Sequence, residues 1–223
     1  MPLDDILQEL EEYDGSSEVY GNIHMFNLRQ LIENVEHKKP QRDISIVDVV
    51  RHPVAFVQSG YHNIYSQCLF NPNRVDYVTK VKDWNQDLYD QYANKYSLDL
   101  KDLKVLSFMA NVMTFKSFEI NFGLHDQHDI HVVPMESLTG NASELKALFA
   151  KVSAGDIDLN KSEVDAFLNT ERSNVHDPAK RKMTNQEKYE SWEDWQKDLF
   201  REVIVSTGCK ERFEKIGYDL SYV

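Results

Sequence analysis

Arg51 and Ser59 are the residues of this sequence whose types and spacing best suit the binding of an anion. Arg51 follows the apolar run 44–50, and Ser59 comes eight residues later. An arginine offers a planar fork of N–H donors, a serine adds a hydroxyl, and the start of a helix carries partial positive charge. The pattern suits an anion site at a strand–helix junction. A surface ion pair of Arg51 is the structural alternative.

The segment 44–69 would position this pair. Residues 44–50 are β-branched and almost continuously apolar, as is typical of a buried strand in a parallel sheet. Pro53 suits the first turn of a helix, because the N–H that proline lacks has no partner there. Apolar residues then follow helical spacing as far as Leu69. The sequence therefore predicts a central parallel strand over 44–50 and a helix over 54–69 that leaves its carboxyl end.

This segment resembles the second donor-binding element of the sulfotransferases that use 3′-phosphoadenosine-5′-phosphosulfate (PAPS). That element reads Arg-x-Pro, with a Ser eight residues after the Arg and a Tyr nearby. Arg51, Pro53, Ser59 and Tyr61 match it in type and spacing. The resemblance extends more weakly over about residues 20–223.

Three weaker similarities agree with this family. Glu136-Ser137-Leu138, after a short strand predicted over 130–133, resembles its strand-then-Glu-x-Leu element. Gly217-Tyr218-Asp219 resembles a Gly-Tyr-Asp close to the family's C-terminus. His24 lies 27 residues before Arg51, roughly where these enzymes keep a catalytic His.

The resemblance implies an α/β fold, helix-rich and similar to the three-layer P-loop NTPases, with a parallel central sheet. It implies transfer of a sulfuryl group from PAPS to a hydroxyl or amine of a small-molecule or glycan acceptor, without a metal. Arg51 and Ser59 would bind the donor 3′-phosphate, and His24 would activate the acceptor. Lys180, Arg181 and Lys182 would stand in for a basic donor-binding loop, with a solvated basic turn as the alternative.

One departure affects the expected activity. The family opens with an apolar strand and a phosphosulfate loop that contains Lys and a Gly-Thr pair, and no segment here matches it. Gly15-Ser16-Ser17 follows an acidic helix pattern and has no Lys. We expect the first strand and loop to be missing and transfer to be impaired. The alternative is a non-catalytic interaction module on the same fold.

A third hypothesis starts from the histidines at 125–131. His125, His128 and His131 are possible zinc or manganese ligands, which would indicate a metal hydrolase, although the segment lacks a helical His-x₃-His face. A polar loop is the alternative. The Gly-x-Ser-x-Gly motif of serine hydrolases is absent from the sequence.

Composition limits the function classes further. The chain has 223 residues, 41% of them hydrophobic, and a net charge of −12. This acidity disfavours nucleic-acid binding as the main function. The two cysteines, Cys68 and Cys209, form neither a disulfide framework nor a metal knuckle, and no apolar run is long enough to span a membrane. We expect one cytoplasmic domain over residues 1–223.

Helical periodicity predicts most of the remaining elements. Helices are expected over 3–13 and 27–35, separated by a turn at 14–17. Two apolar stripes are expected in 72–122: Val81, Trp84, Leu88, Tyr89 and Tyr92, and then Leu103, Leu106, Met109, Ala110 and Met113. Capping patterns predict helix starts at Asn141, Ser162 and Thr184, and the last long helix is expected to carry Trp192, Trp195 and Leu199.

Overall fold

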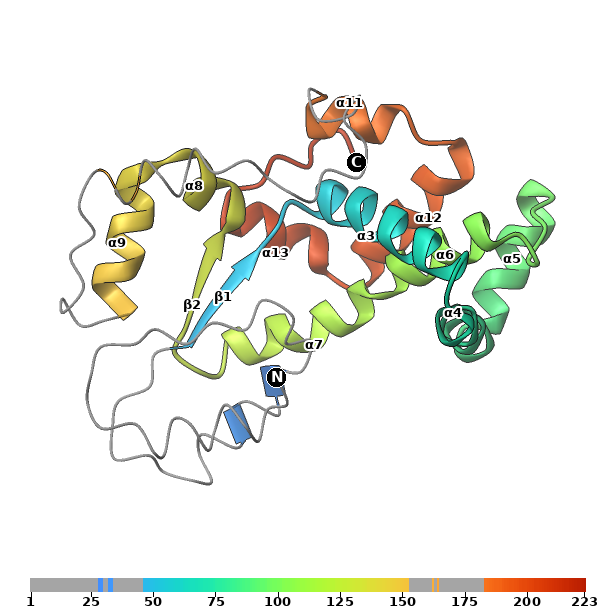
Figure 1. Cartoon of the computed structure of the whole chain (residues 1–223), viewed down its shortest axis with the longest axis horizontal. Helices are drawn as coiled ribbons and strands as arrows, with labels where there is room; N and C mark the ends of the chain where they lie inside the picture. The colour runs from blue at the N-terminus through green and yellow to red at the C-terminus, as the bar shows by residue number, and fades with distance from the viewer. Residues whose placement is uncertain (1–27, 30–31, 34–45, 153–161, 163, 165–182) are drawn as a thin grey trace. The chain divides into compact units, whose positions relative to one another are not determined.

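The structure is a computed structural model of the whole chain, and it describes residues 28–29, 32–33, 46–152, 162, 164 and 183–223 (Figure 1). These residues belong to two compact units. The sheet unit lies within Met1–Val50 and Ile120–Glu171, and the helical unit within Arg51–Glu119 and Arg172–Val223. The single domain expected over 1–223 stays a prediction.

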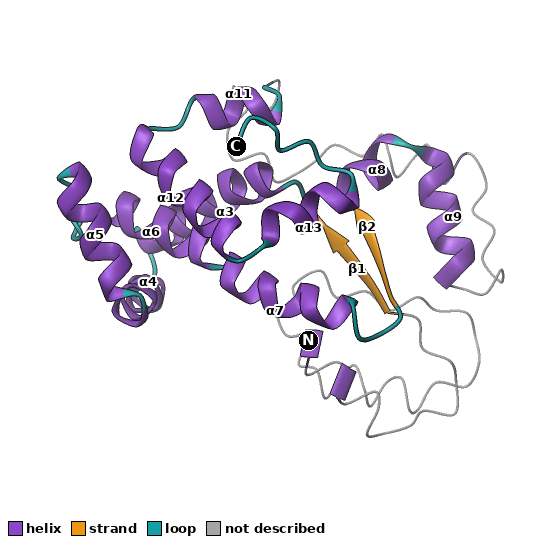
Figure 2. Cartoon of the chain, turned by 180° about the vertical axis from the view of Figure 1, so that it is seen from behind, coloured by secondary structure: helices purple, strands orange, loops and turns teal. Residues whose placement is uncertain are grey.

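The sheet unit contains two parallel strands, β1 (Ile46–Val50) and β2 (Ile130–Pro134), shown in Figure 2. They are paired in register from Ile46–Ile130 to Val50–Pro134. Their Ile and Val side chains suit a pleated, half-buried surface. The parallel strand predicted over 44–50 is therefore confirmed for 46–50, and residues 44–45 lie outside the described residues.

Apolar clusters cover both faces of this strand pair, because successive side chains of a strand point to opposite faces. On one face, Ile46 and Ile130 contact a cluster of buried residues: Leu28, Ile32 and Leu124. On the other face, Val47 packs against a second buried cluster: Val133, Leu138, Leu145 and Val164. Leu28 and Ile32 are helical, as the prediction for 27–35 requires, while Leu31 is outside the described residues. Cover on both faces is typical of parallel α/β sheets.

The position predicted for the first strand needs a correction. Among the described residues the sheet has two strands, so β1 lies at an edge and not in a central position. Val49 is 46% exposed, and only Val50 of this strand is buried. A continuous apolar run indicates burial, but it does not show how many neighbours a strand will have.

Two helices follow β2 in the sheet unit, α8 (Met135–Gly140) and α9 (Ala142–Val152). Asn141 caps α9, since its Oδ1 accepts a hydrogen bond from the Ser143 N–H at 3.0 Å. This helix start was predicted. The start at Ser162 is tested only in part, because Asp165 lies outside the described residues. The helix predicted over 3–13 and the turn predicted at 14–17 also lie outside them.

The helical unit begins with four helices, which are listed with their bounds: α3 (Pro53–Cys68), α4 (Pro72–Trp84), α5 (Gln86–Tyr96) and α6 (Leu103–Met113). The next helix, α7 (Phe115–His125), belongs to this unit as far as Glu119 and then to the sheet unit. Three more described helices belong to the helical unit: α11 (Asn185–Glu190), α12 (Asp194–Ser206) and α13 (Cys209–Ile216). Among the described helices, none is both long and apolar enough to cross a membrane.

The helical unit has its core around α6, whose residues from Val105 to Met113 are all buried. A helix that is buried on every side needs partners for its polar groups. Asn111 has one, because its Nδ2 donates to the Val57 carbonyl oxygen of α3 at 2.8 Å. The largest fully buried side chains of the unit are Val54, Val57, Tyr89, Tyr92, Phe108, Met109, Phe115, Leu199, Phe200, Ile204, Phe213 and Leu220.

Two helix assignments made from periodicity need correction. The stripe from Val81 to Tyr92 is divided between α4 and α5, and Trp84 is 77% exposed instead of buried. Asn85 separates the two helices, with φ −127° and its side-chain amide bonded to the Val81 carbonyl oxygen at 2.8 Å. Trp192 precedes α12 instead of lying in it. The helix start at Thr184, by contrast, is confirmed as a complete capping box.

Candidate functional site

The junction before α3 is built by His52 and Pro53. Pro53 occupies the first turn of the helix, and the His52 Nδ1 accepts a hydrogen bond from the Val54 N–H at 3.2 Å. The His52 carbonyl oxygen accepts from the Phe56 N–H at 2.8 Å and so begins the helical ladder. His52 is 5% exposed. An imidazole nitrogen thus replaces the Ser, Asp or Asn oxygen that usually caps a helix.

Arg51 and Ser59 both lie in the helical unit, at the start of α3, and both side chains are half-buried. Ser59 lies six positions after Pro53, which corresponds to about 9 Å along a helix axis. An arginine side chain that precedes the first turn can reach along part of that length. That both side chains hold one phosphate stays a prediction.

Tyr61 has a packing role, in agreement with its place among the residues of 54–69 that follow helical spacing. Its ring lies edge-on to Phe108 of α6, with 5.7 Å between ring centroids, and burial raises the pKa of its phenol. Its hydroxyl therefore keeps its proton near neutral pH. The structure gives it a place in the contact between α3 and α6.

Next to Tyr61, Gly60 allows α3 and α6 to approach each other closely. A Cβ atom at this position would lie 2.8 Å from Asn111 Cγ. The Asn111 side chain cannot move away without losing its bond to the Val57 carbonyl oxygen. The residue after Ser59 is thus restricted by packing, which holds this turn of α3 against α6.

The other predicted site residues lie outside the described residues. These are His24 and the basic segment Lys180, Arg181 and Lys182. Their roles as general base and donor-binding loop stay predictions.

Among the described residues, the structure does not group His125, His128 and His131 as the metal ligands of the third hypothesis. His125 Nε2 lies 2.9 Å from Asp48 Oδ2, and His131 Nδ1 lies 3.0 Å from Lys151 Nζ. Asp48 and His131 belong to opposite faces of the strand pair, because the register aligns His131 with Val47. Within the ranges that the structure describes, no three His, Cys, Asp or Glu side chains are grouped as metal ligands. The metal-hydrolase hypothesis is therefore not supported.

The two cysteines are buried thiols that form no disulfide. Cys68 belongs to the core, as predicted from its place on the apolar side of its helix. Burial raises the pKa of Cys209 to about 11, and its Sγ donates to the Phe115 carbonyl oxygen at 3.5 Å. A thiol with a raised pKa is a weak nucleophile, so Cys209 does not suggest thiol chemistry.

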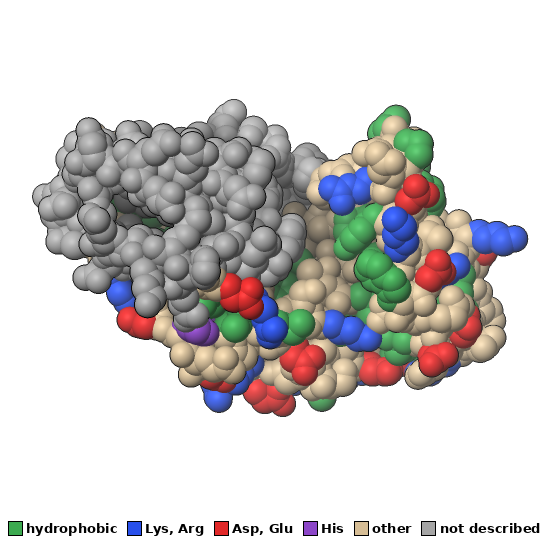
Figure 3. Space-filling model, turned by 90° about the horizontal axis from the view of Figure 1, so that it is seen from below, with side chains coloured by type: hydrophobic (Ala, Val, Ile, Leu, Met, Phe, Trp, Pro, Cys, Tyr) green, Lys and Arg blue, Asp and Glu red, His purple; other side chains and the backbone are tan. Residues whose placement is uncertain are grey.

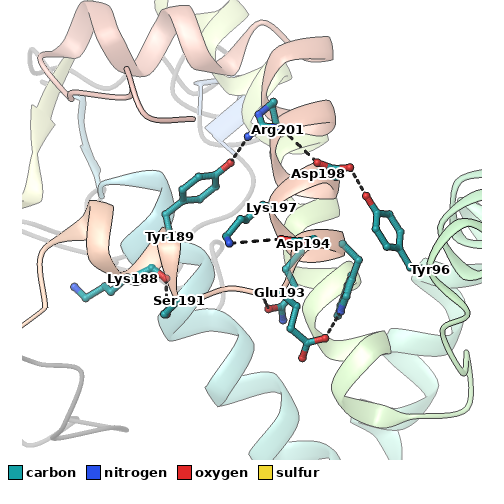
Figure 4. Close-up of polar contacts among 11 residues, drawn as sticks. Tyr96, Lys188, Tyr189, Ser191, Glu193, Asp194, Lys197, Asp198 and Arg201 are labelled. Atoms are coloured by element: carbon teal, nitrogen blue, oxygen red, sulfur yellow. Dashed lines mark hydrogen bonds and ion pairs between the residues drawn. The ribbon is translucent and has the colours of Figure 1, made fainter.

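Figure 4 shows a polar cluster that periodicity did not predict, centred on Asp198 of α12. Tyr96 donates to Asp198 Oδ2, Lys95 Nζ donates to the same oxygen at 2.9 Å, and Arg201 lies 3.4 Å from Oδ1. The Tyr96 and Lys95 bonds lower the pKa of Asp198. Arg201 also donates to the Tyr189 hydroxyl at 3.0 Å. The cluster joins α5, α11 and α12 and has a structural role.

The charged side chains of the described surface are distributed without separation by sign on the face that is seen from below in Figure 3. On the face shown in Figure 3, acidic and basic side chains are interspersed over the described surface.

Comparisons of the chain with models of protein families, with curated proteins and with solved structures found no match.

Proposed function

We propose that the chain is a sulfotransferase-like protein with a P-loop-type α/β fold, and that it binds the nucleotide end of PAPS at the start of α3. The observation that carries the proposal is the junction of a parallel strand with a helix, at which Arg51-x-Pro53 is followed by Ser59. In parallel α/β sheets, ligands bind beyond the carboxyl ends of the strands. Arg51 follows such an end in the sequence.

The chemistry of the two side chains suits a phosphate monoester. The Arg51 guanidinium presents parallel N–H donors, and the Ser59 hydroxyl adds a neutral donor one and a half turns into the helix. His52 already satisfies the Val54 N–H, so the side chains, more than that amide, would hold the phosphate. The ligand we assign to this half-site is the 3′-phosphate of the donor.

The reaction of the proposed family moves a sulfuryl group from the 5′-phosphosulfate of PAPS to an acceptor hydroxyl or amine. The bond between sulfur and the bridging oxygen breaks, the acceptor bonds to sulfur, and the acceptor proton passes to a base. Adenosine 3′,5′-bisphosphate (PAP) leaves. His24 is proposed as that base, because imidazole accepts protons readily near neutral pH.

Calorimetry with PAP tests the half-site. Arg51→Ala should weaken PAP binding by about 10- to 100-fold and Ser59→Ala by about two- to tenfold, since hydrogen bonds from charged donors are the stronger ones. Arg74→Ala is the matched control, because Arg74 is another half-buried arginine of the helical unit and contacts the Tyr77 ring instead. Equal affinity in all four proteins would contradict the site.

A further inference from the structure

The Gly-Tyr-Asp segment near the end of the chain turns the backbone back from α13. Gly217 has φ +107°, a conformation that residues with a Cβ adopt only at a cost, and it ends the helix. The Tyr218 N–H then bonds to the Phe213 carbonyl oxygen at 3.1 Å. The turn directs Tyr218, which is 9% exposed, against the ring of His52, with 5.1 Å between centroids.

Asp219 closes a second turn directly afterwards. Its Oδ1 accepts from the Ser221 N–H at 3.0 Å, and this bond is the main cause of its lowered pKa. The chain then reaches Tyr222, whose hydroxyl lies 3.3 Å from His52 Nε2. The ring of Tyr222 rests on Tyr189 of α11, with 5.6 Å between centroids. Two aromatic residues from one short segment thus contact the same histidine.

The bond from the Val54 N–H decides which ring nitrogen of His52 carries a proton. Nδ1 accepts from the Val54 N–H, so it carries no proton, and the proton of the neutral ring is on Nε2. Nε2–H therefore donates to the Tyr222 hydroxyl. Burial raises the pKa of Tyr222, so the phenol keeps its own proton while it accepts. The ring of His52 is fixed on one edge by α3 and on the other by the C-terminal segment.

We infer that Tyr218–Tyr222 is a clamp that positions Arg51 for its phosphate, an inference that rests on the proposed function. The peptide group between Arg51 and His52 is planar and stiff. Fixing the His52 ring and its place as helix cap therefore holds the backbone directly after Arg51, which limits the directions in which the Arg51 side chain can leave it. A guanidinium held in its binding geometry loses less conformational freedom when the anion binds. Tyr218 and Tyr222 are positioning residues, since neither is assigned a contact with the ligand.

The first measurement is amide exchange in the absence of ligand. Tyr222→Phe keeps the ring on Tyr189 but removes the hydroxyl that accepts from the His52 Nε2–H. Exchange of the Val54 and Phe56 amides should become about three- to tenfold faster, as expected for one lost hydrogen bond. Tyr189→Phe is the control: it removes a hydroxyl from the same aromatic cluster, but one that bonds to Arg201. That variant should leave both amides unchanged.

The second measurement is PAP affinity in a double-mutant cycle. Tyr222→Phe should weaken PAP binding by about two- to tenfold when Arg51 is present and have no further effect in Arg51→Ala, because the clamp acts through Arg51. An equal loss in both backgrounds would overturn the positioning role. Unchanged exchange at Val54 and Phe56 would overturn the clamp, whatever the PAP result. No PAP binding by the wild type would overturn the proposed function and the role assigned to Arg51, while the exchange data would still decide the clamp.

Discussion

Two glycines of this chain should respond in opposite directions to the same substitution. Gly60 faces Asn111 across the contact of α3 with α6, and a Cβ there would lie 2.8 Å from Asn111 Cγ. Gly123 of α7 has no atom within 4 Å of its Cβ position. Packing therefore requires glycine at position 60. At position 123, glycine only lowers the stability of the helix, because it loses more backbone freedom on folding than other residues do.

We expect Gly60→Ala to lower the free energy of unfolding by about 1–3 kcal/mol, as overpacking of a filled core usually does. Gly123→Ala should raise it by about 0.4–1 kcal/mol, because alanine restricts the unfolded chain and suits a helix. Urea unfolding of both variants measures this. A stabilised Gly60→Ala protein would show that Asn111 can move away without cost.

A second pair of residues, Tyr89 and Tyr92 of α5, also differs in environment. Both are buried, but within the described residues the Tyr89 hydroxyl has no hydrogen-bond partner, whereas the Tyr92 hydroxyl donates to Glu202 at 2.7 Å. Tyr89→Phe should be neutral or stabilising, because it removes an unsatisfied buried group. Tyr92→Phe should cost about 1 kcal/mol. Thermal unfolding of the two variants compares them, and a larger loss for Tyr89→Phe would contradict the assignment.

At the scale of elements, capping chemistry was predictable and helix boundaries without caps were not. Asn141 and the pair Thr184–Glu187 carry their signals within three residues, and both helix starts were found. The break at Asn85 was missed, because the residues on either side of it continue one helical period. His52 was missed as a cap, because histidine is not among the usual capping residues.

The capping box at α11 should make stability depend on pH. The Thr184 N–H donates to Glu187 Oε2, and this bond lowers the pKa of Glu187 from 4.5. The folded state then binds fewer protons than the unfolded state. Glu187 therefore contributes stability above about pH 4.5, and this contribution is lost as pH falls through the lower folded-state pKa.

Glu187→Gln keeps an acceptor for the Thr184 N–H but does not titrate. Between about pH 5 and pH 3, its free energy of unfolding should fall less steeply than that of the wild type. Denaturant titrations at several pH values provide the slopes. Identical slopes would mean that Glu187 titrates alike in the folded and unfolded states.

At the scale of the whole molecule, the helix-rich α/β character could be predicted, but the arrangement around the site could not. The apolar run at 46–50 and the stripe beyond Pro53 are local signals, and they appear as β1 and α3. The contact of Tyr218 and Tyr222 with His52 joins residues more than 160 positions apart, since the Tyr222–His52 pair alone spans 170. No periodicity reports a contact of that kind, so only the structure could show it.

The two ends of PAPS make different demands on the protein, and this difference leads to a prediction about activity. Arg51 and Ser59 would hold the 3′-phosphate, which does not change during sulfuryl transfer. Contacts of this kind are about equal in the ground and transition states, so they assist binding without lowering the chemical barrier. The reacting end of PAPS needs N–H donors and a cation that stabilise the charge growing on the bridging oxygen. No segment of this sequence matches the family's loop that supplies them.

We therefore expect this chain to bind PAP while it turns over PAPS very slowly with any acceptor. A panel of hydroxyl and amine acceptors with PAPS, run beside PAP calorimetry on the same protein, measures both quantities. Arg51→Ala should reduce PAP affinity and leave the low turnover at saturating PAPS almost unchanged, because Arg51 acts far from the reacting sulfur. Turnover at ordinary enzyme rates of about 1 to 10³ per second would show that other residues of this chain supply the missing donors. A fall in that saturated rate in Arg51→Ala would instead place Arg51 at the reacting end of the donor.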